Sequence, residues 1–406
     1  MRVSSEQTLS ARSMITTTAA VSLKNLLYDT TRPAAPELAV RVDGDESKVR
    51  CVACGHRCVI PEGRSGVCKV RFNRSGELRV PWGYVASVQC DPIEKKPFFH
   101  AFPGRDALSF GMLGCDFHCS YCQNWVTSQA LRDDRAVAGP TFCKPRDLVN
   151  VAIQHRAPVM VSTYNEPLIT TDWAVDVFRE AKTQGIVCGY VSNGNATPEV
   201  LRYIRPYVDL YKVDLKSFDD KHYRQLGGTL QNVLDTIVLL KELGFWIEIV
   251  TLVVPGWNDG EDELRAIARF LAGVSNEIPW HVTSFHPDYK MTADQGWVRT
   301  TAETLIRAYN YGREAGLHFV YPGNLPGQVG DREHTYCPRC DTLAVKRSGF
   351  YVLFNTMEGD ACFNCGQKIP GVWEQAPPRQ TVGTGIPRAV RLPVYDRSAG
   401  QPGVQG

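Results

Sequence analysis

The sequence predicts an α/β fold, in which a full or partial (βα) barrel of parallel strands carries two small cysteine-rich modules. Three observations support this prediction. Short apolar runs alternate with helical periodicity over residues 106–325, eleven of the 14 cysteines fall into three tight groups, and the chain of 406 residues exceeds the usual size of one domain. With 43% hydrophobic and 22% charged residues, the composition is that of a globular protein.

The barrel segment contains seven strand candidates that are apolar throughout and rich in β-branched residues. They cover residues 107–113, 158–163, 186–192, 210–215, 245–254, 280–285 and 317–321. Helix candidates between them cover residues 173–184, 198–204, 229–243, 262–271 and 302–315. Apolar strands that alternate with helices form a parallel sheet, and the active site of such a barrel lies at the C-terminal ends of its strands.

The rest of the chain divides into four segments. We expect residues 1–36, rich in Ser, Thr and Ala, to be flexible, with an organelle targeting segment as the alternative. Residues 37–105 read as a cysteine-rich strand-and-loop module, and residues 334–375 as a second cysteine module. Residues 376–406 contain several Pro and Gly without periodicity and are expected to form a flexible tail.

Charge and hydropathy exclude several classes of partner. The 45 basic and 43 acidic side chains leave a net charge of +2, which predicts no nucleic-acid partner. No apolar run is long enough to cross a bilayer, so we expect no membrane association. Clustered cysteines are typical of reduced, metal-binding thiols, which predicts a cytoplasmic protein.

The central cysteine group has the spacing C-x3-C-x2-C directly after the first barrel strand. It comprises Cys115, Cys119 and Cys122, called the triad below. Three thiolates are one fewer than a structural zinc site or a saturated [4Fe–4S] cluster needs. An iron left open can bind the amine and carboxylate of S-adenosylmethionine (SAM) and pass one electron to it, which yields a 5′-deoxyadenosyl radical. The alternative is three buried or zinc-binding cysteines.

The triad, with aromatic Tyr121 before its last cysteine, resembles the radical SAM superfamily. The resemblance implies a cofactor site that includes Tyr121. It also implies that Glu166, in Thr163-Tyr-Asn-Glu166-Pro167, meets the methionine amine of SAM. This sequence lacks the two glycines that usually precede that Glu-Pro pair. Taken alone, Asn-Glu-Pro is only a helix start.

Further positions resemble the activases of glycyl-radical enzymes. The resemblance implies that Asn193 lies near the ribose, that Asp214 and Lys216 face the cofactor, and that His286 contacts its carboxylate. Each has a structural alternative: a turn at Asn193, an ion pair between Asp214 and Lys216, and a loop histidine at position 286.

Two more cysteine groups offer four thiolates each. The ribbon quartet has two C-x2-C pairs with the spacing of a zinc ribbon, for which we expect structural zinc, with an auxiliary cluster as the alternative. It consists of Cys337, Cys340, Cys362 and Cys365. The N-terminal quartet consists of Cys51, Cys54, Cys58 and Cys68. Zinc and an auxiliary [4Fe–4S] cluster are both open for this group, and His56 could replace one of its thiolates.

Longer strings over residues 45–375 are similar to the radical SAM enzymes of the AmmeMemoRadiSam system, relatives of the pyruvate formate-lyase activating enzymes. The most specific string is Asp91-Pro-Ile-Glu-Lys-Lys-Pro97. Read alone, it is a charged turn whose Lys95 and Lys96 are solvated. The resemblance implies an oxidoreductase that works beside Memo-like and AMMECR-type partner proteins.

These observations favour an enzyme that cleaves SAM reductively and abstracts hydrogen from an unidentified substrate, with a protein as one option. A glycyl-radical enzyme activase of the pyruvate formate-lyase type is the first alternative. A non-catalytic zinc-ribbon adaptor is the second. An enzyme of this kind needs a one-electron reductant such as flavodoxin or ferredoxin.

Overall fold

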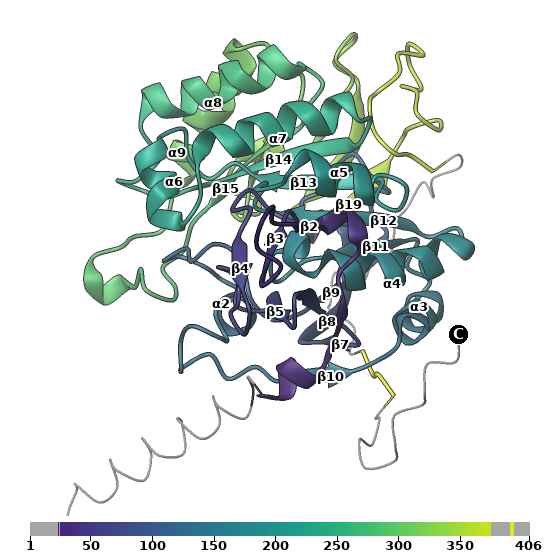
Figure 1. The fold of residues 1–406 in the computed structure, drawn as a ribbon. Helices are drawn as coiled ribbons and strands as arrows, with labels where there is room; N and C mark the ends of the chain where they lie inside the picture. The colour runs from purple at the N-terminus through teal and green to yellow at the C-terminus, as the bar shows by residue number, and fades with distance from the viewer. Residues whose placement is uncertain (1–22, 24, 375–389, 394–406) are drawn as a thin grey trace, which may run out of the picture.

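A computed structural model of the chain describes residue 23, residues 25–374 and residues 390–393. Its centre is a curved eight-stranded sheet in the order β16-β15-β14-β13-β12-β11-β9-β8 (Figure 1). The strands are β8 (Ser87–Pro92), β9 (Asp106–Gly111), β11 (Val159–Ser162), β12 (Val187–Ser192), β13 (Leu210–Asp214), β14 (Trp246–Val253), β15 (Trp280–Ser284) and β16 (Val320–Gly323). The strands from β9 to β16 are parallel, and β8 runs antiparallel to β9.

The sheet is the partial form of the predicted barrel. In the described part of the chain no pairing joins the two edge strands, β8 and β16. Each of the seven parallel strands falls on a predicted strand, because the apolar runs that predict them are the residues that the layers bury. The last one begins three residues later than expected, since the amides of Leu317 and His318 bond to Gly312 and Asn276 rather than to the sheet.

Helices accompany the central strands, and all except α2, which lies at the C-terminal edge, cover the outer face of the sheet. They are α2 (Trp125–Ser128), α3 (Pro145–Gln154), α4 (Thr171–Thr183), α5 (Pro198–Ile204), α6 (Asp220–Leu226), α7 (Leu230–Glu242), α8 (Glu261–Val274) and α9 (Ala302–Glu314). Their apolar residues recur every three or four positions and face the core, as Ala174, Phe178 and Ala181 do in α4. The sequence did not predict α2, α3 and α6.

The cysteine-rich N-terminal module consists of two small sheets. One contains β1 (Thr31–Pro33), β5 (Phe72–Arg74) and β6 (Glu77–Pro81), and the other β2 (Ala39–Arg41), β3 (Lys48–Cys51) and β4 (Val59–Pro61). Two expected boundaries therefore change. Strand β1 lies inside the segment 1–36 that was expected to be flexible, because its residues pair with β6. Strand β8 lies inside 37–105 yet belongs to the central sheet.

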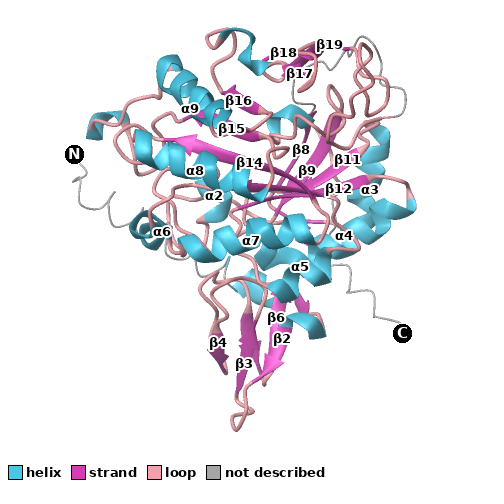
Figure 2. Ribbon diagram, turned by 90° about the horizontal axis from the view of Figure 1, so that it is seen from above, coloured by secondary structure: helices cyan, strands magenta, loops and turns pink. Residues whose placement is uncertain are grey.

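The C-terminal module is a three-stranded antiparallel sheet of β17 (Thr335–Tyr336), β18 (Leu343–Ser348) and β19 (Tyr351–Asn355). In Figure 2 it lies at the top of the view, and β2, β3 and β4 project from the opposite side of the molecule, beyond α5 and α7. The remaining pair is β7 (Tyr84–Val85) with β10 (Thr141–Phe142). The rest of the expected flexible segments, residues 1–22 and most of 376–406, lies outside the described residues.

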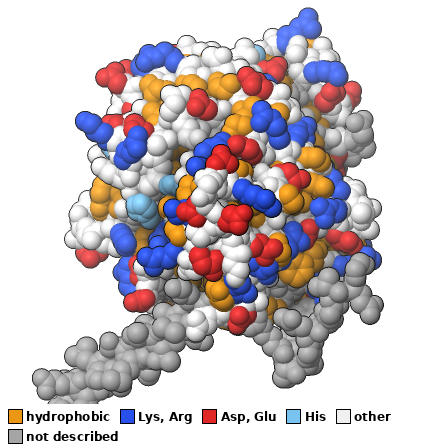
Figure 3. Space-filling model, in the orientation of Figure 1, with side chains coloured by type: hydrophobic (Ala, Val, Ile, Leu, Met, Phe, Trp, Pro, Cys, Tyr) orange, Lys and Arg blue, Asp and Glu red, His pale blue; other side chains and the backbone are white. Residues whose placement is uncertain are grey.

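The surface in Figure 3 carries acidic and basic side chains interspersed over the whole visible face, with no large field of one sign. None of the helices in the described ranges combines the length and apolar character that a bilayer-spanning helix needs.

Candidate active site

The triad lies in the loop that joins β9 to α2, at the C-terminal edge of the sheet. The chain reaches this loop through Gly114, whose φ of +91° is left-handed and favours glycine. Cys119 is buried, and Cys115 and Cys122 are half-buried. The loop therefore holds three sulfurs at the edge where a (βα) barrel keeps its active site.

Hydrogen-bond donors point at the triad sulfurs. The Phe117 amide donates to Cys115 Sγ over 3.4 Å, and Ser128 Oγ lies 3.2 Å from Cys122 Sγ. Burial raises the pKa of all three thiols, that of Cys119 to about 12. A cation is therefore needed to hold these groups as thiolates, and the donors are already placed to stabilise them.

Glu166 follows β11 and is buried beneath the same edge. Its Oε1 accepts from the Ser192 hydroxyl over 2.7 Å and from the Leu168 amide over 3.1 Å, and its Oε2 accepts from the Asn193 amide over 2.7 Å. The contact with Leu168 caps the short 3-10 helix η3 (Pro167–Thr170), so the expected helix start is real. Burial, followed by the nearby Asp116 carboxylate, raises the pKa of Glu166 to about 8.

Asp116 connects the Glu166 region to the triad. Its Oδ1 accepts from Asn193 Nδ2 over 2.7 Å and lies 3.8 Å from Cys115 Sγ, and its Oδ2 accepts from Asn195 Nδ2 over 2.9 Å. The structure thus brings Asn193 and Glu166 together with the first cysteine of the triad.

Asp214 ends β13 and is bound by two lysines. Lys216 Nζ lies 3.3 Å from Asp214 Oδ2, and Lys212 Nζ donates to Asp214 Oδ1. Burial opposes ionisation of Asp214, but the two ammonium groups outweigh it and lower its pKa. Lys216 is close enough to Cys119 to favour its thiolate. Asp214 and Lys216 therefore form the expected ion pair and also adjoin the triad.

Tyr121 and His286 complete the predicted set. Tyr121 is buried and meets Trp257 edge to face, with ring centroids 5.5 Å apart. His286 is exposed on the loop after β15, and its Nδ1 lies 3.1 Å from Gln123 Nε2, one residue beyond the triad. All six predicted cofactor residues thus lie at the same edge of the sheet.

The Asp91–Pro97 string is not a solvated turn, in contrast to its reading in isolation. Lys96 Nζ lies 2.8 Å from Asp91 Oδ1 and 3.0 Å from the Tyr164 hydroxyl, and only 5% of its side chain is exposed. Lys95 also pairs with Asp91, at 2.9 Å, but remains 37% exposed. Because Tyr164 precedes Glu166 by two residues, this string supports the turn that presents Glu166.

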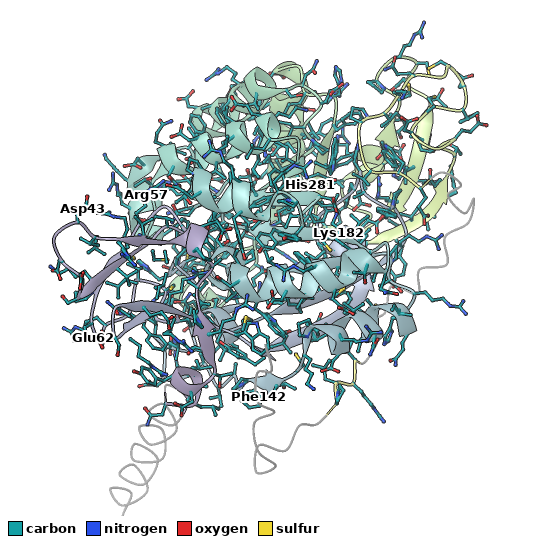
Figure 4. All side chains as sticks on the ribbon, turned by 45° about the vertical axis from the view of Figure 1, so that its right-hand side comes forward. Asp43, Arg57, Glu62, Phe142, Lys182 and His281 are labelled. Atoms are coloured by element: carbon teal, nitrogen blue, oxygen red, sulfur yellow. The ribbon has the colours of Figure 1, made fainter. Side chains whose placement is uncertain are left out.

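The opposite end of the barrel is closed. Buried residues of the segment after β8, among them Ile93 and Phe98, pack against the first residues of the parallel strands. Glu248, near the start of β14, accepts from two amides of this segment and lies 2.7 Å from His281 Nε2. Figure 4 shows His281 among the central strands. These residues fill the end of the barrel opposite the triad.

The ribbon quartet is drawn together without disulfides. Cys337 and Cys365 have their sulfurs 3.6 Å apart, and Cys340 and Cys362 theirs 3.7 Å apart. All four sulfurs lie within 4.8 Å of one another. Four thiolates this close could hold one metal ion.

Sequence reasoning missed Asp116 and Lys212. Asp116 lies inside the triad, where only the three cysteines suggested chemistry. Lys212 lies two residues before Asp214 on the same face of β13, and this alternation was the available signal.

Comparison with known proteins gives one family match, two relatives and one structural neighbour. The family model of the radical SAM superfamily matches residues 111–271. An uncharacterized protein of Methanocaldococcus jannaschii is 38% identical over 329 residues, covering 80% of this chain and 96% of the relative. The pyruvate formate-lyase 1-activating enzyme of Escherichia coli is 26% identical over 200 residues, covering 45% of this chain and 77% of that enzyme. Among solved structures, SuiB of Streptococcus suis gives a TM-score of 0.41 at 15% identity, over 53% of this chain and 48% of SuiB.

Proposed function

Because the chain belongs to the radical SAM superfamily, we propose that it is an oxidoreductase that cleaves SAM reductively and abstracts hydrogen from a substrate. The observation that carries the proposal is an open set of three cysteines beside a buried carboxylate and an ion pair, all at the C-terminal edge of the sheet. A [4Fe–4S] cluster bound there supplies one electron, which converts SAM to methionine and a 5′-deoxyadenosyl radical.

Glu166 and Asn193 orient the two ends of the cofactor in this proposal. Glu166 is held by three hydrogen bonds, so its carboxylate stays fixed while it accepts a bond from the methionine amine. The Asn193 side chain is tied to Asp116 through Nδ2, and its amide oxygen accepts from the Asn195 amide. A ribose hydroxyl would share these partners.

Asp214 and Lys216 keep opposite charges fixed beside the triad. Pairing with Lys212 and Lys216 lowers the pKa of Asp214, and pairing with Asp214 raises the pKa of Lys216, so both groups stay ionised despite burial. The Lys216 ammonium stabilises the thiolate form of the triad cysteines, and the Asp214 carboxylate can accept a hydrogen bond from the cofactor. His286 remains available from the outer loop for the cofactor carboxylate.

Aromatic contacts shield the site from water. The Trp125 ring, directly after the triad loop, stacks on Tyr289 of the loop after β15, with centroids 5.1 Å apart and planes at 10°. The Lys290 amide donates to the Ser120 carbonyl over 3.0 Å, which ties the same two loops together. Shielding of this kind protects a radical from side reactions.

Two substrate classes follow from the relatives. The relationship to pyruvate formate-lyase activating enzymes supports a glycyl-radical activase as the alternative, with hydrogen abstracted from a protein glycine. A different protein side chain or a small molecule remains within the leading proposal. A non-catalytic adaptor is disfavoured, because membership in the superfamily implies an enzyme.

The proposed partners are a flavodoxin-type or ferredoxin-type donor of one electron and, from the family resemblance, Memo-like and AMMECR-type proteins. The proposed metal of the ribbon quartet is zinc. A tetrahedral ion with bonds of about 2.3 Å places sulfurs about 3.8 Å apart, close to the 3.6 and 3.7 Å between its paired cysteines.

Anaerobic reconstitution with iron and sulfide, followed by reductant and SAM, tests the proposal. We expect 5′-deoxyadenosine and methionine from the wild type, and none from Cys115→Ala, Cys119→Ala or Cys122→Ala. Cys143→Ala, which removes a buried cysteine outside the three groups, is the matched control and should retain cleavage. Undiminished cleavage in any triad variant would exclude the triad as the cluster site.

A further inference from the structure

The N-terminal quartet forms a second cysteine site against the barrel. Its members come from β3, from the loop between β3 and β4, and from the segment before β5. All four are free thiols, three of them buried and Cys58 half-buried. Three buried thiols and one half-buried thiol from three segments therefore lie together in this module.

Backbone amides are arranged around these sulfurs as they are around the triad. The amides of His56, Val67 and Val70 point at the sulfurs of Cys54, Cys58 and Cys68 respectively. The Arg71 guanidinium, which is almost fully buried, approaches the Cys51 sulfur to 3.9 Å. Each thiol therefore faces a donor that would stabilise its ionised, metal-bound form.

The spacing of the sulfurs separates this quartet from the ribbon quartet. Among the described residues, the ribbon quartet is the only group of three or more ligand atoms that all lie within 4.8 Å of one another. No three sulfurs of the N-terminal quartet are that close, and neither are the three of the triad. A single ion draws its ligands to one point, whereas each cysteine of a [4Fe–4S] cluster binds a different iron and stays farther from the others.

His56 does not supply a ligand in place of a thiolate. Its Nε2 lies 3.2 Å from the carbonyl oxygen of Asp116, and the ring is directed at the triad loop. Four thiolates then remain, which saturate a cluster and leave no iron open for SAM.

The N-terminal quartet is in contact with the triad loop. A Cβ on Gly114, the residue before the triad, would lie only 3.1 Å from the carbonyl oxygen of Cys68 and 2.9 Å from a methyl group of Val70. Asp116 lies between the two sites, close enough to interact electrostatically with both Cys54 and Cys115.

We propose that the N-terminal quartet holds an auxiliary [4Fe–4S] cluster in electronic contact with the triad. One electron from a low-potential one-electron donor protein passes through it to the cluster of the triad. The donor is thereby oxidised by one electron and the triad cluster reduced by one, with no bond or proton transferred. The proposal rests on the proposed function only for the identity of the electron acceptor.

The test removes the three triad cysteines and measures the iron and sulfide that the rest of the chain binds. The full chain carrying Cys115→Ala, Cys119→Ala and Cys122→Ala together is reconstituted anaerobically with iron and sulfide, then analysed for metals and by electron paramagnetic resonance (EPR) after dithionite reduction. We expect about four irons and four sulfides per chain and the signal of a reduced [4Fe–4S] cluster. Because this variant cannot cleave SAM, its iron content is independent of the proposed function.

A second variant and a control complete the test. Cys54→Ala with Cys68→Ala should lose about four irons and keep a triad signal that changes when SAM is added, whereas Cys143→Ala should lose none. In reduced wild type, spin coupling should broaden the spectrum relative to the sum of the two variant spectra. If the variant without triad cysteines binds no iron and carries a second zinc ion, the N-terminal quartet does not hold a [4Fe–4S] cluster. If the wild-type EPR spectrum equals the sum of the two variant spectra, the two clusters are not in electronic contact.

Discussion

Replacing Glu166 by glutamine separates cofactor binding from folding. The amide is nearly isosteric with the carboxylate but cannot ionise. A hydrogen bond from the cofactor amine to a charged acceptor contributes roughly 1.5–3 kcal/mol, so Glu166→Gln should weaken SAM binding by about ten- to a hundredfold. The cluster should be unaffected, because Glu166 is not a metal ligand.

The pH dependence of stability gives this prediction a second readout. Burial and Asp116 raise the pKa of Glu166 from its ordinary value of 4.5 to about 8, so the folded protein holds a proton that the unfolded chain releases. The resulting stability is fully present below about 4.5 and is lost as the pH rises through about 8. The glutamine variant has no ionisable group at this position, so its stability does not fall in this way as the pH rises. Its free energy of unfolding should therefore rise relative to wild type across that window.

Three measurements decide the outcome for Glu166→Gln: SAM titration with iron content measured in parallel, urea unfolding at several pH values, and calorimetry in buffers of different ionisation enthalpy. Around neutral pH, SAM should displace more protons from wild type than from the variant, because ligation favours the ionised carboxylate. If Glu166→Gln binds SAM with wild-type affinity and releases as many protons as wild type on binding, Glu166 is not part of the cofactor site.

Three further predictions test neighbouring features. Lys216→Ala should reduce turnover without bleaching the iron–sulfur absorbance, and a lower melting temperature with unchanged SAM affinity would reduce Lys216 to a structural role. Cys362→Ala should lower the zinc content proposed for the ribbon quartet and lower stability, because metal affinity there is folding free energy; iron alone in metal analysis of the purified chain would exclude zinc. Arg71→Leu should destabilise the fold by about 3–5 kcal/mol because it leaves buried Asp172 unpaired, and adding Asp172→Leu should recover much of the loss. A double variant no more stable than the single variant in urea unfolding would contradict that reasoning.

The parallel strands could be predicted because burial on both faces leaves a continuous apolar run in the sequence. Helices α2, α3 and α6 were not predicted: α2 has only four residues, α3 begins at a proline and α6 begins in a charged stretch. Strand β8 was assigned to the wrong unit for a different reason. Its partner β9 lies beyond a loop of more than ten residues, and long-range pairing leaves no periodic signal in a single strand.

The candidate site could likewise be predicted from the sequence only in part. Cysteine spacing singles out all three cysteine groups, and the structure draws the four sulfurs of the ribbon quartet to within 4.8 Å of one another. Asp116 and Lys212 are ordinary polar residues in sequence, and only the fold brings Asp116 against Asn193 and Lys212 against Asp214. The burial of Lys96 could not be predicted either, because its partner Tyr164 lies in the loop after β11, far from Lys96 in the sequence.

The short helix η3 connects the Glu166 carboxylate to the N-terminal module. Glu166 caps helix η3, whose Ile169 carbonyl accepts from Arg71 Nε over 2.8 Å, and the same guanidinium pairs with Asp172 at the start of α4. Arg71 also contacts Cys51 of the N-terminal quartet. The N-terminal module therefore contacts the helix that Glu166 caps through the buried Arg71–Asp172 pair, and it contacts the triad loop through Cys68 and Val70.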